Sequence, residues 1–174
     1  MNSFPYRSLN LNRRFLKRFA FILALLLPLI GCDKLDNRRL PLANVHLTFY
    51  TQADWVTYGV SGARQWRTFI REQRLPKNYP YTADSYTGFG GILLCSTDIG
   101  DFVAYDLACP VECRADVRVA VGDDGIAECP KCHSRFDIFS LPGYPVAGEA
   151  AEQGYGLQTY RVGPGGGGEY MVVY

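Results

Sequence analysis

The stretch from Cys109 to Asp137 reads CPVECRADVRVAVGDDGIAECPKCHSRFD, and its cysteines fall into two close pairs. Cys109 and Cys113 form the first pair, Cys129 and Cys132 form the second, and fifteen residues separate them. Two short cysteine loops at this spacing let thiolates converge on one centre from two directions, which is typical of metal sites. The stretch therefore predicts a chain that folds around a metal centre with these four cysteines as ligands.

Strand-like segments flank both cysteine loops. Short apolar runs alternate with Gly- and Asp-rich turns at 98–101 and 122–125, a pattern that predicts antiparallel hairpins with the cysteines near their tips. We therefore expect an all-β fold, a small antiparallel sandwich or barrel with two metal-loop hairpins. The expected strands are 45–50, 92–96, 102–107, 118–121, 126–128, 156–162 and 169–174.

One short helical insertion is expected in this β domain. Apolar residues recur three to four positions apart after Ser61-Gly62, which predicts a helix within 54–73 that covers one side of the sheet. The stretch 76–91 is rich in Pro, Tyr and Gly and is expected to be a loop. The residues that carry the helical pattern are Ala63, Trp66, Phe69 and Ile70.

The N-terminal residues predict an export signal. Basic residues precede an apolar run from Phe19 to Ile30, which is shorter than the roughly 20 residues that span a bilayer and has the length of a signal-peptide core. The run ends in Leu29-Ile-Gly-Cys32, which resembles the lipobox of bacterial lipoproteins, where the cysteine is lipidated and begins the mature chain. The alternative is a membrane-anchor helix in which Cys32 has no special role.

The expected organisation follows from that signal. Residues 1–31 would be a lipoprotein signal peptide, 32–44 a lipidated tether and 45–174 one β domain, held at the bacterial cell envelope outside the cytoplasm. Cleavage would remove five of the 18 basic residues and none of the 17 acidic ones, so the mature 143 residues carry a formal net charge of −4. That charge argues against nucleic acid as a partner. The expected partners are the membrane, through the lipid, and a redox or envelope protein.

The second cysteine pair belongs to a longer motif. Cys129-Pro-Lys-Cys-His-Ser-Arg-Phe-Asp137 resembles the second cluster-binding box of Rieske-type iron-sulfur proteins, Cys-Pro-x-His-Gly-Ser-x-Tyr/Phe-Asp. Cys109 with Pro110 stands where the first box of that family begins. Gly143-Tyr-Pro-Val-Ala-Gly-Glu-Ala150 is similar to the loop that shields the cluster, Gly-x-Pro-x-x-Gly-Pro-Ala. The resemblance spans about 92–162 and implies a Rieske-like fold, a [2Fe-2S] cluster and electron transfer.

The chain departs from the family at both histidine ligands. Val111 and Cys132 occupy the two histidine positions, and His133 stands where the family has glycine. Cys113 is the natural substitute for the first lost ligand, so the expected ligand set is Cys109, Cys113, Cys129 and Cys132. His133 is the reserve candidate, although its adjacency to Cys132 would strain simultaneous ligation.

Three occupants fit four cysteines at this spacing. A [2Fe-2S] cluster with four thiolates fits the inherited fold, whereas a tetrahedral zinc ion fits the spacing equally well and would be structural. The third alternative is two disulfides, Cys109 with Cys129 and Cys113 with Cys132, which an exported protein could keep. The resemblance favours the cluster, with zinc as the alternative cofactor. With zinc or disulfides the domain would be a structural or interaction module.

Further residues near the boxes carry weaker expectations. Ser134 matches the family's serine, whose hydroxyl points at a bridging sulfide, and Phe136 stands where a tyrosine would donate to a cysteine sulfur. Pro145 belongs to the shielding loop, and Cys95 in an apolar run is expected to be a core residue. Because no nucleophile and base pair is readable and the histidines for a catalytic iron are missing, we do not expect an enzyme.

Overall fold

The computed structural model describes residues 35–164 and 170–173. The predicted signal peptide and Cys32 lie outside this part of the chain, and so do most of the residues of the Gly-rich stretch 163–168. Within the described ranges, no helix is long and apolar enough to cross a membrane.

Most of the regular secondary structure in the described chain is β-strand, which confirms the predicted all-β class. Two short α-helices and one 3₁₀ turn accompany the strands. The elements in chain order are β1 (Val45–Phe49), α2 (Gln52–Tyr58), β2 (Trp66–Phe69), the 3₁₀ turn η2 (Arg71–Gln73), β3 (Tyr86–Thr87), β4 (Ile92–Ser96), β5 (Phe102–Asp106), β6 (Ala120–Val121), β7 (Ile126–Glu128), β8 (Arg135–Asp137), β9 (Tyr144–Ala147), α3 (Glu149–Gln153), β10 (Thr159–Pro164) and β11 (Tyr170–Val173).

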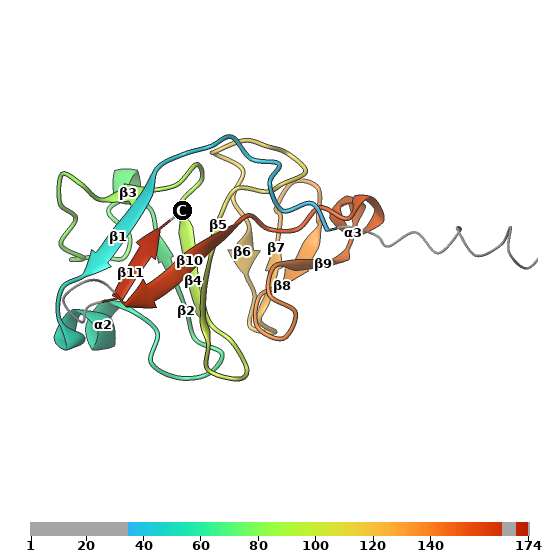
Figure 1. Cartoon of the computed structure of the whole chain (residues 1–174). Coiled ribbons are helices and arrows are strands. Elements are labelled where there is room, and N and C mark those ends of the chain that lie inside the picture. The colour runs from blue at the N-terminus through green and yellow to red at the C-terminus, as the bar shows by residue number, and fades with distance from the viewer. Residues whose placement is uncertain (1–34, 165–169, 174) are drawn as a thin grey trace, which may run out of the picture. The chain divides into compact units, whose positions relative to one another are not determined.

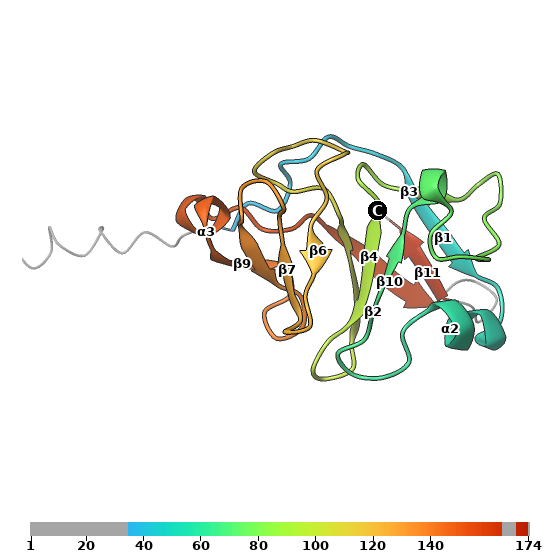
Figure 2. The same cartoon turned by 180° about the vertical axis from the view of Figure 1, so that it is seen from behind.

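The strands form two antiparallel sheets. The larger has seven strands in the order β2-β4-β5-β10-β11-β1-β3, and the smaller has four in the order β6-β7-β8-β9 (Figure 1). Strands β2 and β3 are the two ends of the larger sheet, so this sheet is open and does not close into a barrel. In both views α3 lies against β9 of the smaller sheet and α2 lies near the larger one (Figures 1 and 2).

Strand β4 is buried on both faces, and this explains its apolar run from Ile92 to Cys95. Leu93 and Cys95 point into a core that also contains two of the four loop cysteines. Ile92 and Leu94 point the other way, into an aromatic core around Phe49. Alternate residues of a strand face opposite sides, so a strand between two cores must be apolar at every position. Cys95 is therefore a core residue, as expected, and burial raises the pKa of its thiol.

The helix near the start of the domain lies earlier than the sequence pattern predicted. Helix α2 begins after Thr51, whose hydroxyl accepts the Asp54 N–H while the Asp54 carboxylate accepts the Thr51 N–H, both at 3.0 Å. This reciprocal cap defines the helix start. The predicted helical pattern instead falls partly on strand β2, which pairs with β4 from Trp66 opposite Cys95 to Phe69 opposite Ile92. Pairing with a buried strand overrides a short periodic pattern.

A second helix, α3, was not expected, so the prediction of one helical insertion is wrong in this respect. Gly148, with φ 76°, precedes α3 and Gly154, with φ 69°, ends it. A Cβ on Gly148 would lie 2.9 Å from the Cα of Ser134, so glycine is required for α3 to approach the second cysteine loop.

The sequence analysis also missed four short strands, β2, β3, β8 and β9. Strand β9 covers half of the stretch 143–150 that was expected to be a shielding loop.

The described part of the predicted tether, 35–44, packs on the β domain. Asp36 donates its N–H to the carbonyl of Gly154 and accepts the N–H of Gly156 at its own carbonyl. Leu40 is buried. Figure 1 shows this segment in blue, running from near α3 to β1. The folded domain therefore includes residues before Val45.

Candidate metal site

The two cysteine loops, 109–113 and 129–133, have the same backbone turn. In the first, the carbonyl of Cys109 accepts the N–H of Cys113 at 2.9 Å, and in the second the carbonyl of Cys129 accepts the N–H of His133 at 3.1 Å. The fifth residue of each loop is left-handed, with φ 50° at Cys113 and 57° at His133. Proline follows the leading cysteine in both loops. The molecule thus presents two copies of one turn.

Each copy is held by the strands around it. The first loop follows β5, and Cys109 donates its N–H to the carbonyl of Val117 at 3.0 Å. The second loop joins β7 to β8, where Cys129 donates its N–H to the carbonyl of Ser134 at 3.0 Å. The leading cysteines are therefore fixed by backbone hydrogen bonds, and the rest of each loop extends from them.

A buried carboxylate anchors the start of the first loop. Asp106, at the end of β5, is fully buried and accepts the N–H groups of Phe89, Gly90 and Ala108 at 2.8, 2.9 and 2.8 Å. The hydroxyl of Tyr160 donates to it at 2.6 Å. Burial raises the pKa of this carboxyl, and the four donors oppose that shift. Because Ala108 directly precedes the loop, this network sets the position of Cys109.

Three thiols converge between the loops. The Sγ atoms of Cys109, Cys129 and Cys132, called here the thiol triad, lie within 4.8 Å of one another. Cys109 and Cys132 are 3.6 Å apart at Sγ. A tetrahedral zinc ion with Zn–S bonds of about 2.3 Å has S···S edges of about 3.8 Å. The triad therefore has dimensions that suit three ligands of one metal ion.

Polar groups face the triad thiols. Burial raises the pKa of the Cys109 thiol, and the N–H groups of Glu112 and Val111, which point at its sulfur, oppose that shift. Burial acts in the same direction on Cys132, but the hydroxyl and N–H of Ser134 together with the thiols of Cys129 and Cys109 outweigh it, so the pKa of Cys132 is lowered. Donors aimed at sulfur favour the thiolate, which is the form that binds metal.

Ser134 connects the sulfur of Cys132 to helix α3. The thiol of Cys132 donates to Ser134 Oγ at 3.3 Å, and the same Oγ accepts the N–H of Ala150 in α3 at 3.1 Å. Once Cys132 is deprotonated, the Ser134 hydroxyl can turn its own hydrogen toward the thiolate. Helix α3 was not predicted from the sequence, yet it orients Ser134, which was predicted to lie beside the site.

Cys113 lies apart from the triad. Its thiol donates to the carbonyl of Pro110 at 3.1 Å and lies 3.9 Å from the carbonyl of Arg39. It therefore faces the 35–44 segment. His133, the reserve ligand, is exposed, and its Nδ1 lies 3.2 Å from Oε1 of Glu128. Both residues occupy the left-handed fifth position of the turn, from which the side chain leaves the loop on the outer side.

The sequence carried a signal for this difference. Aligning the loops on their Cys-Pro pairs places Glu112 opposite Cys132 and Cys113 opposite His133. The structure brings together three of the four predicted cysteines and follows this alignment. The disulfide alternative would need the Cys113 thiol to turn toward Cys132; the five cysteines of the described chain are free thiols.

Phe136 and Pro145 lie beside the site as a packed pair. Phe136 on β8 is fully buried and pairs in register with Pro145 on β9. The stretch expected to shield a cluster is here largely an edge strand. These two residues support the second loop through packing, and no hydrogen bond from them reaches a sulfur among the described residues.

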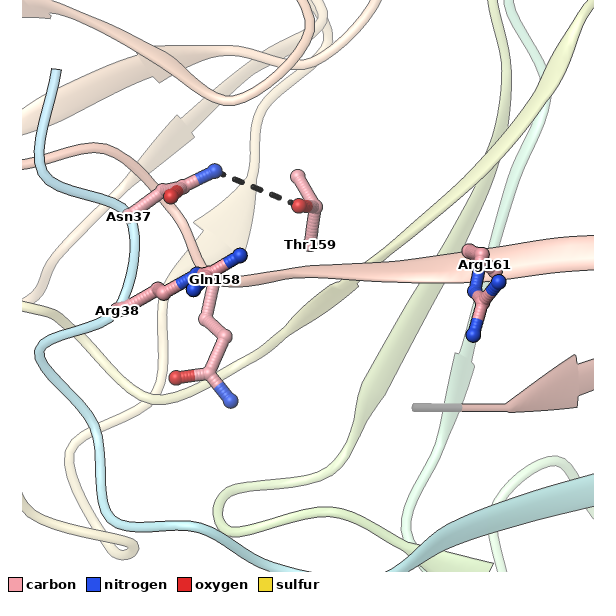
Figure 3. A pocket seen from close by; sticks show the side chains of 5 residues that line it. All are labelled: Asn37, Arg38, Gln158, Thr159 and Arg161. Atoms are coloured by element: carbon pink, nitrogen blue, oxygen red, sulfur yellow. Dashed lines mark hydrogen bonds between the residues drawn. The ribbon is translucent and has the colours of Figure 1, made fainter.

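A separate hollow lies away from the cysteines. It has a volume of about 480 Å³ and is polar (Figure 3). Asn37 donates to the hydroxyl of Thr159 across it at 3.5 Å, and Gln158 has a buried Nε2 without a hydrogen-bond partner in the described chain. Its lining contains no cysteine or histidine among the described residues, so it is not a second thiolate site. The lining residues are Asn37, Arg38, Gln158, Thr159 and Arg161.

Comparisons with known proteins add no assignment. No protein-family model matches this chain, and no curated protein matches it significantly. The resemblance to the Rieske boxes rests on the quoted residues.

Proposed function

We propose that this protein is a metal-binding module in which the thiol triad holds one metal ion, and that the ion joins the two cysteine loops. The observation that carries the proposal is the convergence of three sulfurs from two loops within 4.8 Å. Zinc is the ion that best suits thiolates at tetrahedral spacing.

The spacing of the sulfurs favours one ion over a [2Fe-2S] cluster. Such a cluster has two irons, each with two protein ligands, so thiolates on opposite irons lie farther apart than thiolates on one ion. Here all three triad sulfurs lie within 4.8 Å of one another, and the thiol of Cys113 faces Pro110 and Arg39. The residues as arranged fit a mononuclear centre better than the cluster.

Electron transfer through a [2Fe-2S] cluster is the second candidate function. It is supported by the order of the Rieske-like boxes and by the Ser134 hydroxyl beside the Cys132 sulfur. A bound cluster would supply one-electron transfer. Cys109, Cys129 and Cys132 would serve this centre too, and Cys113 would have to turn inward to complete it.

Bound metal would act mainly on stability. The loops are joined by strands β6 and β7, and an ion between them ties the end of β5 to the β7–β8 turn. Binding free energy at such a site adds to folding free energy, because the unfolded chain has no preformed site. In this proposal the domain is a binding or interaction module, not an enzyme.

The proposed location is the bacterial cell envelope, with a lipid on Cys32. The supporting observation is the lipobox after a short apolar run. Replacing Cys32→Ser should leave an uncleaved precursor that no longer carries lipid, measured by mass and by metabolic labelling with a fatty acid. Normal processing and labelling of that variant would contradict the proposal.

Metal analysis of the full chain tests the function. Protein purified in detergent without added metal should contain one zinc per chain and show no visible absorption. Cys129→Ser should lose the zinc, whereas Cys113→Ser, the matched control in the first loop, should keep it. Two irons per chain with visible absorption that dithionite bleaches would instead establish the electron-transfer candidate. Protein with neither metal nor free thiols would contradict both.

A further inference from the structure

We infer that Glu112 supplies the fourth ligand of the metal ion, so that the site consists of three thiolates and one carboxylate. The inference rests on the proposed metal-binding function. Closed zinc sites are almost always four-coordinate, and carboxylate oxygens are ordinary zinc ligands. The thiol triad provides three ligands, which leaves one position to be filled by a residue next to it.

The shared turn places Glu112 in the right position. In the second loop the fourth residue, Cys132, directs its sulfur to within 3.6 Å of the Cys109 sulfur. Glu112 is the fourth residue of the first loop, which has the same closing hydrogen bond and the same left-handed fifth residue. Equivalent backbone positions send their side chains to the same side of the turn, so the backbone directs Glu112 toward the side of the triad. In the structure its carboxylate pairs with Lys131 and is not within 4.8 Å of all three sulfurs, so the side chain would have to rotate to reach the ion.

The burial of Glu112 supports this position. Its side chain is only 12% exposed, which is unusual for a glutamate on a surface loop. Its Oε2 forms an ion pair with Nζ of Lys131, which belongs to the second loop. Lys131 itself is 57% exposed, so water screens this ion pair. A carboxylate that is largely shielded from water needs compensation for its charge, and a divalent cation at the triad would provide it.

The ion pair with Lys131 holds the Glu112 carboxylate near the second cysteine loop. Lys131 lies directly before Cys132 in sequence, so its ammonium holds Glu112 beside the second loop. Three thiolates and one carboxylate around Zn²⁺ carry a net charge of −2, and the nearby ammonium offsets part of it. Cys113, by contrast, would have to give up both backbone contacts and reverse its side chain to reach the ion.

Cobalt absorption measures the ligand set directly. Co²⁺ substitutes for zinc in such sites, and its sulfur-to-cobalt absorption grows with the number of bound thiolates. The full chain loaded with Co²⁺ should show the intensity of three thiolates. Glu112→Gln should keep that intensity, shift the ligand-field bands and weaken zinc affinity by about tenfold or more. Glu112→Cys should raise the intensity by one third.

Cys113→Ser is the matched control and should leave spectrum and affinity unchanged. Unchanged bands and affinity in Glu112→Gln, or loss of one thiolate in Cys113→Ser, would overturn the inference while metal binding itself stands. A wild-type chain that binds neither Co²⁺ nor zinc would overturn the proposed function instead. Circular dichroism of each metal-free variant checks that the fold is retained, and Glu112→Cys gives a gain of signal that misfolding does not produce.

Discussion

The two cysteine loops share a backbone turn and differ in the residues at its fourth and fifth positions. The first loop has Glu112 and Cys113 there, and the second has Cys132 and His133. In the second loop the fourth-position sulfur joins the triad, and in both loops the fifth-position side chain points away. Position in the turn therefore decides which side chains are directed away from the triad, and the fourth position is the one from which Cys132 reaches it.

The loops also differ in what supports them. The first loop is held at its start by the hydrogen bonds of Asp106. It is also held by Arg39, whose Nε donates to the carbonyl of Pro110 at 2.9 Å. The second is held by Ser134 and, through it, by helix α3. A change in either support should therefore loosen one loop more than the other.

The largest effect should come from removing one leading cysteine of either loop. Cys109→Ser and Cys129→Ser should both abolish metal binding, because the ion needs ligands from both turns. At zinc a thousand times above Kd, wild-type protein should be about 4 kcal/mol more stable than its chelator-treated form. In either variant the chelator should leave the free energy of unfolding unchanged, as measured by urea unfolding. A difference between the two variants would show that the loops do not share one ion.

Removing the Asp106 carboxylate should have the next largest effect. Asp106→Ala removes the acceptor of three backbone N–H groups and one hydrogen-bond partner of the Tyr160 hydroxyl. At roughly 1–3 kcal/mol for an unsatisfied buried group, we expect a loss of about 3–5 kcal/mol in unfolding free energy. The rate of amide hydrogen exchange should increase more in the first cysteine loop than in the second. Asp123→Ala, on an exposed turn, is the control, and equal loosening of both loops would contradict the expectation.

Ser134→Ala should weaken the second loop alone. It removes the hydroxyl that faces the Cys132 sulfur and leaves the Ala150 N–H without its acceptor. Zinc affinity should fall about tenfold, as for other groups that orient metal ligands, and unfolding free energy by about 1 kcal/mol. Competition with a chromophoric chelator measures the affinity. Ser140→Ala provides a hydroxyl control, and an equal loss of affinity in that variant would remove the special role of Ser134.

The smallest effect is expected from Arg39→Ala. The guanidinium donates to Pro110 in the first loop and lies 3.7 Å from the ring centroid of Tyr155. Losing one hydrogen bond and one cation–π contact should lower unfolding free energy by about 1 kcal/mol. Arg38→Ala, whose side chain is exposed, should change it less. If the two variants behave alike in thermal unfolding, the 35–44 segment does not support the first loop.

Much of the fold could be predicted because it depends on local patterns. The run 92–95 is apolar at every position, as expected for a strand buried on both faces, and strands 45–49, 102–106 and 126–128 follow equally plain patterns. Very short strands such as β3 and β8, which were missed, have too few residues to show a period of two. The 66–69 segment reads as helical by spacing, and only its pairing with β4 makes it a strand.

The sequence by itself determined an all-β domain with a thiolate-rich site formed by two loops, because strand alternation and cysteine spacing are properties of neighbouring residues. Only the tertiary structure decided which thiols meet. The spacing of Cys109 and Cys113 is one that pairs of metal ligands commonly have. The left-handed backbone of Cys113 nevertheless directs its thiol toward Arg39. Side-chain direction depends on the turn's dihedral angles and on distant segments that pack against it. Counting cysteines therefore locates the site, and the fold selects its ligands.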